Sequence, residues 1–120
     1  GFPIWTADYP GRKILTAMRD FGYGETDCRV YHYWEEGFPV SVEGTDAAAI
    51  LLERDGAVFL IVTDYGDGGT CAVRLDTRTL RMKPGGTFID VETGKPIGVQ
   101  SADGCRFDLK KHDFKAISYR

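Results

Sequence analysis

Two apolar runs in the middle of the chain, residues 47–52 and 57–62, are separated by the turn Glu53-Arg54-Asp55-Gly56. An Asp-Gly pair between residues that favour strands is a strong hairpin signal, because both central positions of the favoured turn need a positive φ. The two runs therefore predict a pair of antiparallel strands. Neither run alternates apolar with polar residues, so we expect both faces of this hairpin to be covered by protein.

The N-terminal part of the chain contains one helix candidate, residues 12–21. Its apolar residues Ile14, Leu15, Met18 and Phe21 recur at helical spacing, and two glycines follow as stop signals. Short strand candidates separated by Gly, Pro and Asp fill the remaining sequence: residues 29–34, 39–42, 47–52, 57–63, 70–76, 87–91, 105–109 and 114–119. About eight such strands predict an all-β fold, an antiparallel β-sandwich with one short N-terminal helix.

The later strands have the alternation of a sheet with one solvent-facing side. Every second residue from Cys71 to Leu75 is apolar, and so is every second residue from Cys105 to Leu109. Cys71 and Cys105 are therefore expected to act as small buried hydrophobic residues. With Cys28 the chain has three cysteines and no CxxC pattern, so no zinc site is predicted; one disulfide stays an open alternative.

The 120 residues are enough for one domain. A net charge of −3 with interspersed signs leaves no basic stripe for phosphates, so nucleic acid is not an expected partner. No run approaches the roughly 18 apolar residues of a membrane span, so no membrane partner is expected. The bulky apolar opening at Phe2, Ile4 and Trp5 indicates a longer polypeptide. We therefore expect residues 1–28 to be a tether and helix linked to a preceding domain, and residues 29–120 to be the sandwich.

The densest polar and aromatic stretch is Tyr31-His32-Tyr33-Trp34, which two glutamates follow. As a strand it would place Tyr31 and Tyr33 on one face, and His32 and Trp34 on the other. One interpretation is a carbohydrate-binding platform of Trp34, Tyr33 and Tyr65, because flat aromatic faces can stack on sugar rings. The other interpretation is a strand whose aromatic residues anchor the core while their polar tips reach water.

Catalysis is not expected of this chain. Glu35 and Glu36 are adjacent, so in a strand they would point to opposite faces and could not flank one glycosidic bond. No nucleophile elbow or HExxH helix occurs, and His112-Asp113 is interpreted as a turn into the last strand. The loop 64–70 offers carboxylates to Ca²⁺ but lacks the EF-hand spacing, so we interpret it as a Gly-rich connection and predict no metal or cofactor.

Several short motifs follow one another along the chain: Asp20-Phe21-Gly22, Tyr31-His32-Tyr33-Trp34, Pro39-Val40-Ser41-Val42, Val73-Arg74-Leu75-Asp76, Asp90-Val91-Glu92-Thr93-Gly94-Lys95-Pro96-Ile97 and Lys111-His112-Asp113-Phe114-Lys115. In this order they resemble the C-terminal β-sandwich domain that follows the catalytic (β/α)-barrel in large glycoside-hydrolase-like proteins of polysaccharide-degrading bacteria. The resemblance covers nearly the whole chain. It implies a non-catalytic accessory domain that braces the barrel and shapes its substrate cleft, in a secreted or periplasmic protein. The family's catalytic residues lie in the barrel, so none is carried over.

The partner that this resemblance implies is the preceding catalytic domain of the same polypeptide. A sandwich packed against a barrel needs an apolar or aromatic outer face, which residues of the two-faced hairpin, or Trp5 and Tyr9, would supply. The alternative function is an independent carbohydrate-binding module with a glycan as its ligand. A bracing domain buries its aromatic residues against protein, whereas a module leaves a coplanar set open to solvent.

Overall fold

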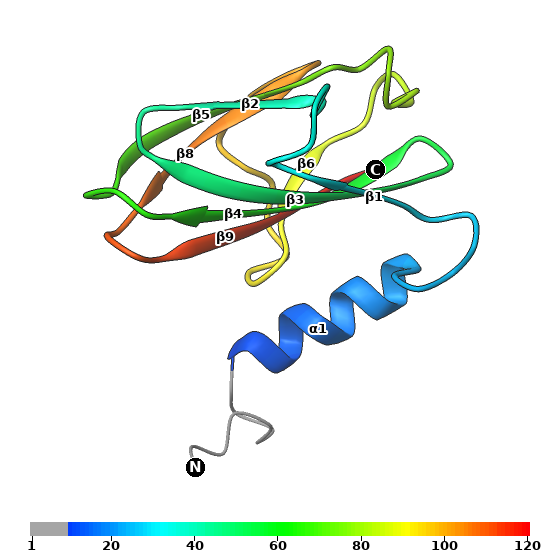
Figure 1. The fold of residues 1–120 in the computed structure, drawn as a ribbon, viewed down its shortest axis with the longest axis horizontal. Coiled ribbons are helices and arrows are strands. Elements are labelled where there is room, and N and C mark those ends of the chain that lie inside the picture. The colour runs from blue at the N-terminus through cyan, green and yellow to red at the C-terminus, as the bar shows by residue number, and fades with distance from the viewer. Residues whose placement is uncertain (1–9) are drawn as a thin grey trace.

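The computed structural model describes residues 10–120, which form one helix and nine strands in two antiparallel sheets (Figure 1). The first sheet has the strand order β1 (Arg29–His32), β3 (Ala47–Arg54), β4 (Ala57–Asp64), β9 (Phe114–Tyr119) and β6 (Phe88–Asp90). The second has the order β2 (Val40–Glu43), β5 (Gly69–Leu75), β8 (Gly104–Leu109) and β7 (Val99–Ser101). Helix α1 (Pro10–Phe21) precedes them. The predicted antiparallel sandwich with one short helix is confirmed.

The central hairpin is formed as predicted by β3 and β4. Leu51 pairs with Leu60 in its middle, and Arg54 pairs with Ala57 next to the turn. At the turn itself, Asp55 has a φ of 52° and Gly56 a φ of 80°. Both values lie in the left-handed region that a two-residue hairpin turn needs.

Besides shifts of one or two residues at several strand ends, the structure differs from the predicted elements at β7, β1 and α1. Strand β7 was not predicted, because three residues at a sheet edge carry too little alternation to be recognised. Strand β1 ends at His32 rather than Trp34, since the backbone turns there and the Glu35 N–H donates to the His32 carbonyl at 3.0 Å. Helix α1 begins at Pro10, two residues before the predicted start, because proline is well tolerated in the first turn of a helix.

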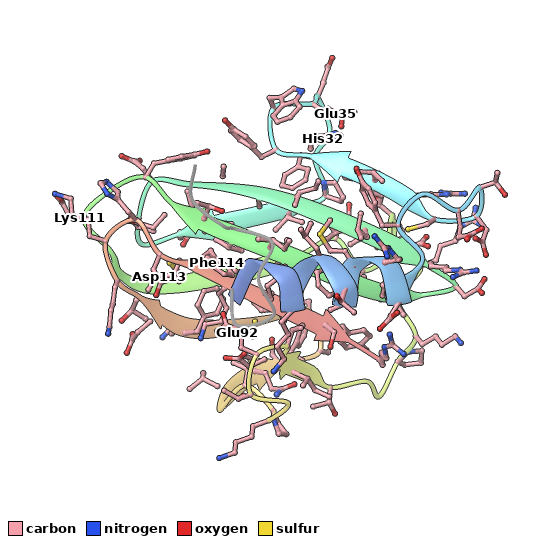
Figure 2. The ribbon with its side chains drawn as sticks, turned by 90° about the horizontal axis from the view of Figure 1, so that it is seen from below. His32, Glu35, Glu92, Lys111, Asp113 and Phe114 are labelled. Atoms are coloured by element: carbon pink, nitrogen blue, oxygen red, sulfur yellow. The ribbon has the colours of Figure 1, made fainter. Side chains whose placement is uncertain are left out.

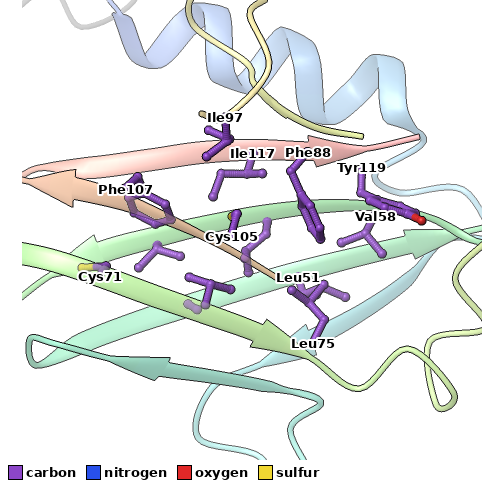
Figure 3. Close-up of a cluster of buried hydrophobic side chains, with 14 of the residues drawn as sticks. Leu51, Val58, Cys71, Leu75, Phe88, Ile97, Cys105, Phe107, Ile117 and Tyr119 are labelled. Atoms are coloured by element: carbon purple, nitrogen blue, oxygen red, sulfur yellow. The ribbon is translucent and has the colours of Figure 1, made fainter. Parts of the chain in front are cut away.

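The main core lies between the two sheets (Figure 3). It contains aliphatic residues of both sheets together with Phe88, Phe107 and Tyr119. Cys71 and Cys105 are buried in this core, as predicted for small hydrophobic residues. Both are free, and so is Cys28, so the three cysteines form no disulfide.

The opposite face of the central hairpin is covered by α1. Ile14 and Phe21 of the helix form a second buried cluster with Leu52, Phe59 and Ala116 of the sheet, as expected from the apolar stripe of the helix. The prediction is wrong for Leu15, which is 49% exposed because it lies one residue beyond Ile14 and faces away from the sheet. The rings of Phe21 and Phe59 are 5.9 Å apart. In Figure 2 the helix lies across the five-stranded sheet.

Two hydrogen bonds connect the ends of α1 to the sandwich. Near its beginning, Lys13 Nζ donates to the Glu92 carbonyl at 2.5 Å. At its end, Arg54 Nη1 donates to the Phe21 carbonyl at 3.3 Å. The helix therefore packs on the sandwich itself. Trp5 and Tyr9, the other residues expected at an interdomain contact, lie outside the described residues.

Candidate functional site

The outer face of the five-stranded sheet is only partly covered by α1. Strand register places His32, Ile50, Ile61 and Ala116 in one row across this face. Ala116 is fully buried within the cluster that α1 completes, whereas Ile50 and Ile61 stay half-buried. In Figure 2, His32 and Glu35 lie on the β1 side of the sheet, away from the helix. An apolar strip between α1 and this edge is left open.

This open strip holds a shallow depression of about 210 Å³ that we call the aromatic hollow. Its lining includes His32, Tyr33, Trp34, Ile50, Ile61 and Tyr65. The volume is below the roughly 300–1,000 Å³ of sites that enclose drug-sized ligands. The hollow can therefore hold one ring or one side chain against the sheet, and it cannot enclose a larger molecule.

Trp34 is held in position at the hollow by its neighbours. Its ring stacks on His32 with centroids 4.5 Å apart and an interplanar angle of 22°. The ring of Tyr33 meets Trp34 edge-on, at 5.3 Å and 80°. Trp34 nevertheless remains 69% exposed. An exposed aromatic ring that is already held in place loses little side-chain entropy when something binds to it.

Glu35 fixes the turn that carries these rings. Its carboxylate accepts the His32 backbone N–H at 2.8 Å and lies 2.7 Å from His32 Nδ1. The hydrogen bond with the His32 side chain, followed by the one with its backbone, lowers the pKa of Glu35 from its ordinary value. A charged Glu35 therefore orients His32, on which Trp34 stacks.

All three residues predicted for a carbohydrate platform lie at this hollow. Tyr33 and Trp34 come from the turn after β1, and Tyr65 comes from the loop after β4, where its N–H donates to the Asp46 carbonyl at 2.7 Å. The interpretation as a core-anchoring strand holds for Tyr31, which packs against the main core, but is wrong for Trp34. The predicted alternation fails after His32 because the strand ends there.

Sequence reasoning missed the apolar floor of the hollow. Ile50 and Ile61 form this floor, and they pair directly with each other across β3 and β4. The signal that could have identified them is the same absence of alternation that marked the hairpin as two-faced. The sequence did not reveal which part of the outer face α1 would leave open.

Asp64 organises the loop 64–70, which was weighed as a calcium site and interpreted as a Gly-rich connection. This buried carboxylate accepts hydrogen bonds from Thr45 Oγ1, from the His112 N–H at 2.9 Å and from the Gly66 N–H at 3.3 Å. Its oxygens therefore tie together the loops after β2, β4 and β8. Within residues 10–120, no group of three or more His, Cys, Asp or Glu residues is arranged to hold a metal ion.

The segment His112-Asp113 forms a turn, as predicted. His112 has a φ of 60°, and the Asp113 N–H donates to the Lys110 carbonyl at 3.1 Å. The backbone N–H of His112 donates a hydrogen bond to the Asp64 carboxylate. His112 therefore takes part in the loop arrangement through its backbone.

The fold and the hollow together define a class: an antiparallel two-sheet sandwich with a helix on one face and an exposed aromatic depression beside that helix. Comparison with protein-family models, with curated proteins and with solved structures found no match to this chain. None of the helical structure within residues 10–120 is long and apolar enough to cross a membrane.

Proposed function

We propose that this chain is a non-catalytic accessory domain of a glycoside-hydrolase-type protein, bracing a preceding catalytic barrel and shaping the rim of its substrate cleft. The observation that carries the proposal is the aromatic hollow, an apolar surface left open beside α1. The order of sequence motifs supports the same assignment by resemblance.

The aromatic hollow has the composition that is typical of the centre of a protein–protein interface. Trp and Tyr are the residues that contribute most at protein interfaces, where they fill pockets surrounded by a polar rim. Here Trp34 and Tyr65 supply the aromatic surface, while Glu35 and Glu36 are exposed next to it. A contact of roughly 600–1,500 Å² between domains would cover the hollow and part of α1.

Amide hydrogen exchange tests the bracing role. We expect amides of residues 31–36 to exchange roughly tenfold more slowly, or slower still, in the natural polypeptide that contains the barrel than in this 120-residue chain. Strand β7 lies in the other sheet and serves as the internal control, with equal rates in both samples. Equal exchange of residues 31–36 in the two samples, or a natural polypeptide without a preceding catalytic domain, would contradict the proposal.

We propose a carbohydrate-binding module as the second candidate. It is favoured by the convergence of Tyr33, Trp34 and Tyr65 on one hollow, where the exposed Trp34 ring can stack on a sugar. The Tyr33 and Trp34 rings stand almost perpendicular to each other, so they would border one sugar ring from two sides rather than form a flat platform. In the first candidate a neighbouring protein domain covers Trp34, whereas in the second a sugar ring covers it.

For this second candidate, Trp34→Ala is expected to weaken oligosaccharide binding by about tenfold or more, since stacking accounts for most of the apolar contact. The Tm should change by no more than about 2 °C, because the ring is 69% exposed. Affinity electrophoresis and titration with cellohexaose, xylohexaose and mannohexaose measure the effect.

The matched control is Tyr23→Ala, which removes a 51% exposed aromatic ring that does not line the hollow. It should leave binding unchanged. Equal losses in the two variants would place the sugar elsewhere. Absence of binding to every oligosaccharide in the panel would eliminate the module and leave the bracing role to be decided by hydrogen exchange.

A further inference from the structure

The solvent-facing side of the four-stranded sheet contains a larger depression, of about 430 Å³, that we call the polar groove. Two small residues, Ala72 of β5 and Gly104 of β8, lie on this side, on the two inner strands of the sheet. A Cβ at Gly104 would be 2.0 Å from the Val73 carbonyl oxygen, so only glycine fits there. The groove therefore exists because the strands carry no bulk at its centre.

Two arginines stand beside this centre. Their neighbours Val73 and Cys105 point into the core, so Arg74 and Arg106 point outward into the groove. Arg74 pairs with Gly104 in the strand register, and Arg106 lies two residues further along β8. Such diagonal neighbours have Cα atoms roughly 7–8 Å apart, close enough for two long side chains to reach one ligand group.

Carboxylates lie near this pair, but none forms a tight ion pair with either arginine. Glu43 is a diagonal neighbour of Arg74, and Asp108 lies two residues from Arg106 on the same face of β8. Arg74 Nε lies 3.8 Å from an Asp103 carboxylate oxygen, a long and exposed ion pair. Arg106 has no carboxylate oxygen within 4.0 Å among residues 10–120. Like charges on neighbouring strands repel, and an anion between the two guanidinium groups would relieve this repulsion. Arginine pairs especially well with planar carboxylates, through two parallel hydrogen bonds.

The side of the groove formed by β2 carries an acidic and a hydroxyl side chain instead of arginines. Glu43 of β2 pairs with Ala72, so it lies two strands away from Arg106, a backbone separation of about 9–10 Å. Ser41 lies on the same strand and also lines the groove. Glu43 accepts hydroxyl hydrogens and repels a second anionic group, while a serine can both donate and accept. This side matches hydroxyl groups rather than another charge.

We propose that the polar groove binds an acidic saccharide, with a uronate carboxylate between Arg74 and Arg106 and sugar hydroxyls at Glu43 and Ser41. The volume of the groove accommodates a short oligosaccharide lying along the sheet. This site is on the sheet opposite to the aromatic hollow, so it does not depend on the proposed function.

Calorimetric titration of the 120-residue chain with aldotriouronic acid, a trisaccharide that carries a single uronate, at low salt tests the proposal. We expect binding that weakens as NaCl is raised, with the neutral xylotriose binding at least about tenfold more weakly. Arg106→Ala should reduce the affinity for aldotriouronic acid by about tenfold or more, the usual effect of losing a charged hydrogen-bond partner. Its Tm should stay unchanged, because Arg106 is exposed.

Two control variants locate the site. Arg19→Ala removes the same charge from an exposed position on α1, and Trp34→Ala removes the centre of the aromatic hollow. Both should bind aldotriouronic acid within twofold of the unaltered chain. An equal loss in Arg19→Ala, a loss in Trp34→Ala, or no binding at millimolar ligand would overturn the proposal. Competition by inorganic phosphate as strong as that by the saccharide would also overturn it, since the groove would then be a general oxyanion site.

Discussion

Replacing Phe21 with alanine is expected to lower the free energy of unfolding by about 3–5 kcal/mol, the usual cost of deleting a buried aromatic side chain. Phe21 is 4% exposed and packs on Phe59, and its loss would leave a cavity under the end of α1. The outer face of the central hairpin would then be partly open to water. Urea unfolding followed by circular dichroism measures the change.

Leu15→Ala is the matched control on the same helix. Leu15 is 49% exposed, so its truncation should change the free energy of unfolding by less than about 0.5 kcal/mol. A loss below about 1 kcal/mol for Phe21→Ala would show that α1 contributes little to the sandwich, as a mere tether would. The expected result instead makes α1 the cover of one face of the sheet, and so defines the edge of the aromatic hollow.

Asp64→Ala is expected to lower the Tm by about 10 °C, because the substitution removes a buried carboxylate that is the shared acceptor of three hydrogen bonds. The donors are Thr45 Oγ1 and the backbone N–H groups of Gly66 and His112, so three loops lose their common anchor. Tyr65 lies in one of these loops. The substitution should therefore also weaken any binding at the aromatic hollow. Differential scanning calorimetry at pH 7 gives the Tm difference.

The control for Asp64 is Asp67→Ala in the same loop. Asp67 is exposed, and its truncation should move the Tm by no more than about 2 °C. Equal effects of the two substitutions would show that the loop tolerates the loss of either carboxylate, and the anchoring role of Asp64 would be wrong.

The contribution of Asp64 should also depend on pH. Its hydrogen bond with Thr45, followed by those with the backbone, lowers the pKa of the carboxyl below its ordinary value of 3.8. The folded state therefore favours the charged form, and the stabilisation is fully present above the pKa of the unfolded chain. It is lost as the pH falls through the lower pKa of the folded state. The Tm values of the unaltered chain and Asp64→Ala should converge in melts below pH 3.8, and a constant difference would contradict this.

The sequence alone determined the features that depend on neighbours a few residues apart. The Asp55-Gly56 turn, the apolar stripe of α1 and the alternation around Cys71 and Cys105 were all readable, because local backbone conformation and side-chain periodicity follow from nearby residues. These features were sufficient to predict the sandwich class. The three residues expected to bind a sugar were also recognised as aromatic candidates, although the apolar floor of Ile50 and Ile61 beneath them was not.

Only the tertiary structure decided which distant segments meet. Strand order brings the β1 turn and the Tyr65 loop to one hollow, and α1 covers one part of the sheet while leaving Ile50 and Ile61 half-buried. The register of β5 with β8 makes Arg74 and Arg106 diagonal neighbours. These arrangements follow from burying the apolar surface of the whole chain at once, a requirement that no short stretch of sequence contains.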